Sequence, residues 1–300
     1  MNRMEPKRIA LLAPGFALLL AACGGGEPGS TPGTDSLSTQ ATDKESELIG
    51  VGGKFFSVPS PVQAAIAIKE AGLKYQKDLT APLEKGDAMT ARMAQAMMMG
   101  VYGADMSYAT VHRDAQRALA TLETIERLSA KLELNNAFDK ALVERFKANM
   151  GSEDSLLRFS GMAFRAADQY LKANDALDVS AWVLAGGWVE GMHLTLADPA
   201  AAKSPVLLAR IGEQKGTLDG LLTVVDGINA DGASDALMKG LKELRQEMEA
   251  VKTTYVFEAP VTDAAKMTTY INSKSTAEVS AEQLAAIAAK VAALRNMILA

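Results

Sequence analysis

The chain has 300 residues, of which 48% are hydrophobic and 22% charged, and its formal net charge is −5 at pH 7. An acidic chain lacks the positive surface that nucleic acids require, which argues against a nucleic-acid partner. Its single cysteine can form no intramolecular disulfide and no thiolate metal site, so the fold must be stabilised by burial. The sequence also lacks GxSxG, HExxH and P-loop motifs, and we expect no enzyme activity.

The first 22 residues have the pattern of an export signal. Three positive charges within residues 1–8 precede an apolar run over residues 9–22, which is too short for a membrane-spanning helix. Pro14 and Gly15 interrupt this run and disfavour the alternative, a buried N-terminal helix.

The end of this run, Leu20-Ala21-Ala22-Cys23, resembles the lipobox of bacterial lipoprotein precursors. The resemblance implies that residues 1–22 are removed, that the Cys23 thiol is linked to diacylglycerol, and that the new amino terminus is acylated. Two or more acyl chains give lasting membrane attachment, so the membrane is the expected partner. Gly24 stands where an aspartate would imply inner-membrane retention, and the resemblance therefore implies the outer membrane.

Residues 23–47 are mostly Gly, Ser, Thr, Pro and acidic residues, which predicts a flexible tether with a reach of about 25–30 Å. Residues 48–300 are predicted to form a single helical domain. Removal of residues 1–22 would take away three positive charges and one negative charge, leaving the mature chain at −7.

The pattern of apolar residues and caps predicts mostly helices in residues 48–300. A capping box at Ser60–Gln63 opens a helix that ends at Gly72. A longer periodic run over 87–132 is expected to break near 100–103 or near 110–114. The further predicted helices cover 136–149, 153–174, 176–197, 204–228 and 234–252.

The composition changes after residue 252. Residues 253–259 and 266–273 are rich in Thr, Tyr, Val, Ile and Phe around a Pro and Asp turn, which predicts a short β-hairpin. A second capping box, Ser280–Gln283, opens a C-terminal helix over 280–298. The predicted fold is mostly all-α, a bundle of about seven to eight helices with a short β-hairpin before the C-terminal helix.

Residues 179–197 could be mistaken for a membrane span. Glu190 and His193 within this stretch would be costly in hydrocarbon, whereas Gly186, Gly187 and Gly191 suit close helix packing. We therefore predict a buried core helix here.

Met89, Met93 and Met97 fall one helical turn apart. A row of thioethers can bind Cu(I), but methionine is also a common filler of apolar cores, and no cysteine or histidine is near in sequence. Core packing is the preferred interpretation, and no cofactor is expected.

A second candidate group lies between residues 102 and 112. Tyr102, Asp105, Tyr108 and His112 share an arc of about 120° on a helix, which would suit the wall of a polar pocket. The alternative is a satisfied hydrogen-bond network between helices.

A third group combines Trp182, Glu190 and His193 on one face of the core helix. The E-x-x-H spacing of Glu190 and His193 is that of di-metal bundles, although only one such pair occurs. A mononuclear metal site could form from four ligands: Asp105, His112, Glu190 and His193. Arg165 and Arg210 are candidate partners for the buried carboxylates, or anchors for an anionic ligand.

Two functions follow as expectations. The first is a lipid-anchored, non-catalytic interaction protein of the cell envelope, with an envelope protein as a candidate partner. Its body resembles helical lipoproteins that have no assigned activity. The alternative is a helical bundle that binds a metal ion or small ligand through the Asp, His, Glu and Arg groups named above.

Overall fold

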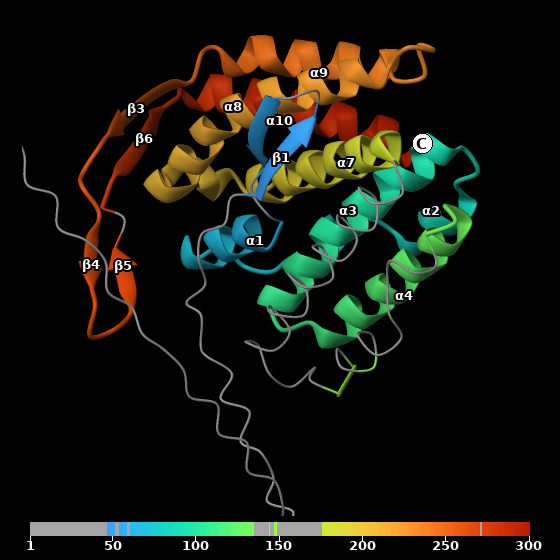
Figure 1. Ribbon diagram of the computed structural model, residues 1–300, viewed down its shortest axis with the longest axis horizontal. Helices are drawn as coiled ribbons and strands as arrows, with labels where there is room; N and C mark the ends of the chain where they lie inside the picture. The colour runs from blue at the N-terminus through green and yellow to red at the C-terminus, as the bar shows by residue number, and fades with distance from the viewer. Residues whose placement is uncertain are drawn as a thin grey trace, which may run out of the picture. The chain divides into compact units, whose positions relative to one another are not determined.

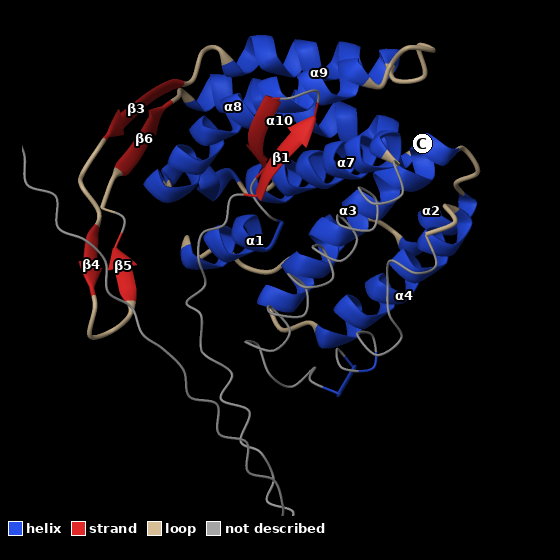
Figure 2. Ribbon diagram, in the orientation of Figure 1, coloured by secondary structure: helices blue, strands red, loops and turns tan. Residues whose placement is uncertain are grey.

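The computed structural model describes residues 47–51, 54–58, 61–134, 144, 147–148, 176–270 and 272–300. All of them belong to one compact unit, Thr42–Ala300. The described residues form eight α-helices and three small antiparallel two-stranded sheets, two of which lie between the last two helices (Figures 1 and 2). The prediction of a mostly helical bundle is therefore confirmed. The predicted signal, Cys23, the predicted tether up to residue 46 and almost all of 135–175 lie outside the described residues. The helices predicted at 136–149 and 153–174, and Arg165, fall in the last of these ranges.

The α-helices are α1 (Pro61–Glu70), α2 (Leu83–Ala88), α3 (Arg92–Val111), α4 (Ala115–Lys131), α7 (Leu177–Leu196), α8 (Pro205–Gly227), α9 (Asp235–Met248) and α10 (Ala281–Leu299). Two short 3₁₀ segments, η1 (Lys77–Leu79) and η2 (Pro199–Lys203), lie in the connections. The capping box at the start of α10 forms as predicted, with Ser280 and Gln283 exchanging side-chain to backbone hydrogen bonds.

The long predicted run over 87–132 is two helices and part of a third. α3 ends at Val111 and α4 begins at Ala115, so the break lies in the second of the two predicted places. The Asp114 carboxylate caps α4 by accepting a hydrogen bond from the Arg117 backbone N–H at 2.9 Å. The predicted start at residue 87 is wrong, because Met89 lies in the connection between α2 and α3.

Helices α3 and α7 pack against each other at the centre of the bundle (Figure 1). Their backbones touch because glycines leave no side chain between them. A Cβ atom on Gly100 would overlap the Val183 carbonyl, and one on Gly186 would overlap the Met97 carbonyl. α7 is thus the predicted core helix, and none of the described helices combines the length and apolarity needed to cross a membrane.

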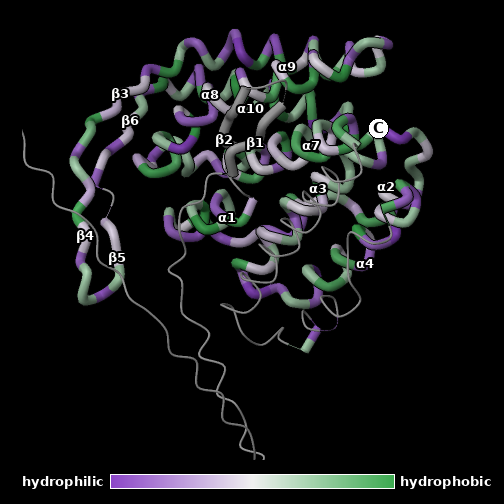
Figure 3. The backbone as a smooth tube through the Cα atoms, in the orientation of Figure 1, coloured by the Kyte–Doolittle hydropathy of each residue, from purple (hydrophilic) through white to green (hydrophobic). Residues whose placement is uncertain are grey.

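Helices α8, α9 and α10 complete the apolar core around this pair. α10 packs on α7 and α9, and α8 packs on α9 and α7. Figure 3 shows hydrophilic and hydrophobic residues alternating along α9, as expected for a helix with one buried face. The buried residues of α9 are Leu237, Met238, Leu241, Leu244 and Met248.

The first sheet was not predicted. β1 (Glu47–Val51) pairs with β2 (Lys54–Val58) in antiparallel register, with Glu47 opposite Val58. Two glycines, Gly52 and Gly53, separate the two apolar runs in the sequence, which is a known hairpin signal.

The second and third sheets form one extended hairpin, the arm, defined as residues 252–278. β3 (Lys252–Val256) pairs with β6 (Lys274–Glu278), and β4 (Val261–Asp263) pairs with β5 (Thr268–Tyr270). The predicted hairpin is found, but its bounds differ: the chain turns at 264–267, so β3 pairs with a strand that begins only at residue 274. Residues 257–260 join β3 to β4 and only 271–273 join β5 to β6, so the side that contains Pro260 is one residue longer. Figure 1 shows β4 and β5 lying away from the helices.

Candidate functional site: a buried carboxyl pair with an arginine

The most unusual polar group in the described residues is a buried ion pair between α7 and α10. Arg295 Nε donates to Glu190 Oε2 at 2.6 Å, and Nη2 donates to Oε1 at 2.9 Å. The Glu190 side chain is fully buried and that of Arg295 is 12% exposed. A bidentate pair satisfies both carboxylate oxygens, which is what a buried charge requires.

Asp105 of α3 completes this group. Its Oδ2 accepts a hydrogen bond from the Ala81 backbone N–H at 2.8 Å. Its Oδ1 is buried, and no donor lies within hydrogen-bond distance of it. Burial, and then the negative charge of Glu190, raise the pKa of Asp105 well above its usual value. The raised pKa favours the protonated form of Asp105, and a hydrogen bond to the Glu190 carboxylate acts in the same direction.

His193 lies one turn after Glu190 on α7. Burial, and then the positive charge of Arg295, lower the pKa of His193 to about 4, while a hydrogen bond to the Leu79 backbone opposes this shift. The imidazole is therefore neutral at pH 7. Burial also raises the pKa of Glu190, whereas the hydrogen bonds and the positive charge of Arg295 lower it.

The same group holds the connection between η1 and α2. Arg295 Nη2 also donates to the Leu79 carbonyl at 2.9 Å, and Arg117 Nη2 donates to the Ala81 carbonyl. With the Asp105 bond to the Ala81 N–H, side chains from three helices bind Leu79 at the end of η1 and Ala81 in the connection that follows. A connection with buried backbone needs such partners. What the geometry supports is a polar clamp that positions the chain after η1.

His112, which was predicted to join this site, lies elsewhere. It is seven residues after Asp105, about two helical turns, so the two side chains lie at different levels of α3. His112 instead stacks on Tyr75 with ring centroids 5.4 Å apart and contacts Tyr108 edge-on at 4.7 Å. Tyr75 in turn donates to Asp114 Oδ2 at 3.0 Å. The predicted set of four ligands is therefore divided between two places.

Tyr102 and Tyr108 are both buried, but each binds backbone rather than lining a polar pocket with Asp105. The Tyr108 hydroxyl accepts from the Gln76 N–H at 3.1 Å. The Tyr102 hydroxyl accepts from the Gly86 N–H at 2.9 Å and donates to the Pro82 carbonyl at 2.7 Å. Burial raises the pKa of Tyr102 to about 12, so the hydroxyl stays a donor. These contacts correspond to the hydrogen-bond network that was the alternative prediction.

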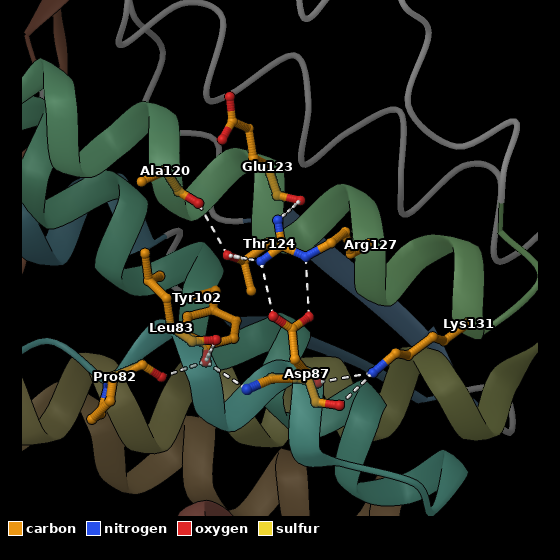
Figure 4. Close-up of polar contacts among 10 residues, drawn as sticks. Pro82, Leu83, Asp87, Tyr102, Ala120, Glu123, Thr124, Arg127 and Lys131 are labelled. Atoms are coloured by element: carbon orange, nitrogen blue, oxygen red, sulfur yellow. Dashed lines mark hydrogen bonds and ion pairs between the residues drawn. The ribbon is translucent and has the colours of Figure 1, made fainter.

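Figure 4 shows how α2 is held between Tyr102 and α4. Arg127 binds Asp87 with two hydrogen bonds, Nε to Oδ1 at 3.0 Å and Nη2 to Oδ2 at 3.2 Å. Lys131 Nζ donates to the Asp87 carbonyl at 2.8 Å. Asp87 and Arg127 are both about half exposed, so this is a surface contact and of small energy.

The other predicted site residues lie apart from the group of Asp105, Glu190 and Arg295. Arg210 forms an exposed ion pair with Glu213 at 3.0 Å on α8 and does not bind the buried carboxyls. Trp182 Nε1 donates to Ser234 Oγ at 3.0 Å, away from Glu190. Met97 is buried in the apolar core, with Met93 partly buried against it, which supports core packing over a copper site.

No metal site is built from these residues in the described part of the chain. There, no three His, Cys, Asp or Glu side chains gather in a way that could hold a metal ion. The Glu190 oxygens, which a metal would need, are both bound by Arg295. The arrangement can hold a proton and fix a connection.

Arg295 was missed in the sequence, although a signal for it exists. The buried residues of α10 are Leu284, Ile287, Val291, Leu294 and Ile298. Arg295 follows Val291 by four residues, so it belongs to the same helical face. A cation on an apolar stripe indicates a buried carboxylate partner, and Glu190 is such a residue on α7.

Comparison with known proteins finds no match: no protein-family model, no curated protein and no solved structure is similar to this chain.

Proposed function

We propose that this chain is a lipid-anchored interaction protein of the cell envelope, with a non-catalytic helical body. The sequence around Cys23 supports the anchor: charged start, apolar run, Leu20-Ala21-Ala22-Cys23 and a Gly-rich continuation. Gly24 supports the outer membrane as its location. The interior polar groups support the absence of catalysis, because Glu190 and Arg295 are directed at each other.

The observation that carries the interaction role is the arm. Six of the eight large hydrophobic side chains that are exposed in the described residues belong to it. They are Tyr255 (64% exposed), Val256 (52%), Phe257 (70%), Val261 (58%), Met267 (87%) and Tyr270 (45%). A concentration of exposed apolar side chains on one segment is typical of a binding surface.

The anchor is tested by labelling cells with radioactive palmitate. Cys23→Ser should abolish incorporation and leave an uncut precursor, whereas Ser38→Ala in the tether should be labelled and cut as wild type. Labelling of the Cys23→Ser chain would contradict the anchor.

The interaction role is tested by native electrophoresis of envelopes solubilised in mild detergent. The double variant Phe257→Ser, Met267→Ser should move from a complex to the free chain, because it removes apolar contacts from the arm. Exposed substitutions change stability by less than about 0.5 kcal/mol, so its melting temperature should hold. Val206→Ser, at an exposed residue outside the arm, should leave the complex intact. Equal mobility of both variants would contradict the role of the arm.

A further inference from the structure

We infer that the partner of the arm is the arm of a second copy of this chain, joined through the edges of β5. This rests on the proposed interaction role and names its partner. The two β5 strands would run antiparallel around a two-fold axis, with Thr269 opposite Thr269 and Thr268 opposite Tyr270. The result is a four-stranded sheet shared by two chains.

The outer part of the arm needs further strands. β4 and β5 pack mainly against each other and against no helix to a comparable extent. Their ladder has three residue pairs: Val261 with Tyr270, Thr262 with Thr269, and Asp263 with Thr268. A two-stranded ladder without a covered face is marginal in water, and additional strands stabilise it.

The charges of the arm suit contact with a copy of itself. Residues 252–278 contain three lysines and three acidic residues, so the arm is neutral in a chain whose net charge is −5. Two ion pairs lie within the arm, Lys266 with Asp263 at 3.2 Å and Lys274 with Glu258 at 3.4 Å. Two arms can therefore meet without bringing net charge together, unlike two acidic bodies.

The edge of β5 is open to pairing, whereas that of β4 is not. Strand edges are usually protected by charged residues or proline. β5 contains Thr268, Thr269 and Tyr270, none of which is charged. β4 follows Pro260 and ends at Asp263. Antiparallel pairing of two β5 strands brings no charges opposite each other.

The distribution of apolar side chains favours a strand over a lipid surface. Tyr255 and Val256 are neighbours on β3, so their side chains point to opposite faces, and both are more than half exposed. A bilayer would contact one face of the arm and leave the other in water. Edge-to-edge pairing of β5 does not cover β3, so the exposure of Tyr255 and Val256 argues only against a bilayer as the occupant.

The test is disulfide cross-linking of the full chain in its own envelope. Thr269→Cys should give a cross-linked dimer on mild oxidation, because directly opposite residues in a sheet have Cβ atoms about 5 Å apart. Thr262→Cys is the matched control, because residue 262 pairs with 269 and faces the same side but lies on the other edge. Thr269→Cys should cross-link at least about tenfold faster, since pairing raises the effective concentration of the thiols.

A second measurement does not depend on cross-linking. Thr269→Lys places two lysines opposite each other and should convert the purified chain from dimer to monomer in sedimentation. Thr262→Lys should remain dimeric. Equal cross-linking rates, or a wild-type chain that sediments as a monomer, would overturn the inference.

Failure of the lipid anchor or of the interaction role would give results that differ from failure of the β5 dimer. In the wild-type chain an unlipidated Cys23 would react with maleimide, which bears on the anchor alone. Loss of the complex in the Phe257→Ser, Met267→Ser variant without cross-linking of Thr269→Cys would retain the interaction role and assign the arm to another protein or the bilayer.

Discussion

The buried group of Asp105, Glu190 and Arg295 balances its charges within a few ångströms. Arg295 binds Glu190 through two hydrogen bonds, and the raised pKa of Asp105 disfavours a second negative charge beside Glu190. Each residue depends on the others, because a buried charge without a partner is strongly destabilising. The substitutions below separate these dependencies.

Arg295→Met should lower the free energy of unfolding by about 3–5 kcal/mol, because it leaves Glu190 buried without a cation. The double variant Arg295→Met, Glu190→Leu should recover most of this loss, since apolar side chains of similar volume can replace a buried pair. Urea unfolding measures both. A double variant as unstable as Arg295→Met would show that the ion pair is not the cause.

The shifted pKa values of His193 and Asp105 change the stability of the fold with pH in opposite directions. The pKa of His193 is lowered from 6.5 to about 4, so the unfolded chain binds more protons between these values and stability falls on acidification. The raised pKa of Asp105 acts in the opposite sense, with stability lost as pH rises above its unfolded value of 3.8.

Asp105→Asn should therefore steepen the loss of stability between pH 6.5 and 4, and His193→Gln should flatten it. The shifted pKa of His193 changes the free energy of unfolding over this pH range by at most about 3 kcal/mol. Because the side chain is partly exposed, solvent screening makes the change smaller. Urea unfolding at several pH values measures the slopes. Identical slopes in wild type and His193→Gln would contradict the shifted histidine.

At the scale of elements, the crossing of α3 and α7 depends on where glycine stands. Gly186 lies against the Met97 backbone, so a Cβ atom there would overlap it. Gly191 lies five residues later on the same helix, and a Cβ atom there would meet no heavy atom within 4 Å. Only the first of these two positions requires glycine for its lack of a side chain.

Gly186→Ala should destabilise the chain by about 1–3 kcal/mol or more, because the methyl group would push α3 and α7 apart. Gly191→Ala should be neutral or stabilising by up to about 1 kcal/mol, since alanine has the higher helix propensity. Thermal unfolding compares the two. Similar losses in both variants would show that glycine flexibility, and not the close approach, matters at residue 186.

Local signals in the sequence were sufficient for most helices. The break before Ala115 and the cap at Ser280 depend on neighbouring residues, and periodicity or capping residues reveal them. The pairing of β3 with β6 follows from a hairpin turn at 264–267, whereas Pro260 and Asp263 had indicated a turn between 259 and 266. The hairpin of β1 and β2 could have been found from Gly52 and Gly53.

The candidate site was predictable only in part. Asp105 is predicted from the arc that it shares with other polar residues of its helix, and Glu190 and His193 from their E-x-x-H spacing. The structure places all three near Arg295. Of the two predicted cations, Arg165 lies outside the described residues and Arg210 pairs with Glu213 instead, because a helical pattern does not tell which helix faces Glu190. Arg295 is 105 residues away in the chain, and only the packing of α10 on α7 joins them.

At the scale of the whole molecule, the neutral arm and the acidic body should respond differently to salt. Dimer formation through the arm should change less than about twofold between about 50 and 500 mM NaCl, because screening acts on net charge that the arm does not carry. Sedimentation at the two salt concentrations measures this. Strong weakening by salt would indicate that charged residues, and not the β5 edge, hold the dimer.

The hydrogen bond from Arg295 to Leu79 joins residues 216 positions apart. A chain emerging from the ribosome carries Glu190 and the connection after η1 long before residue 295 is made. Until then Glu190 has no cation, and enclosing it between α3 and α7 is unfavourable. Enclosure of Glu190 in the bundle is therefore expected only after synthesis has passed α10, so the two ends of the folded body must both be made before its centre can close.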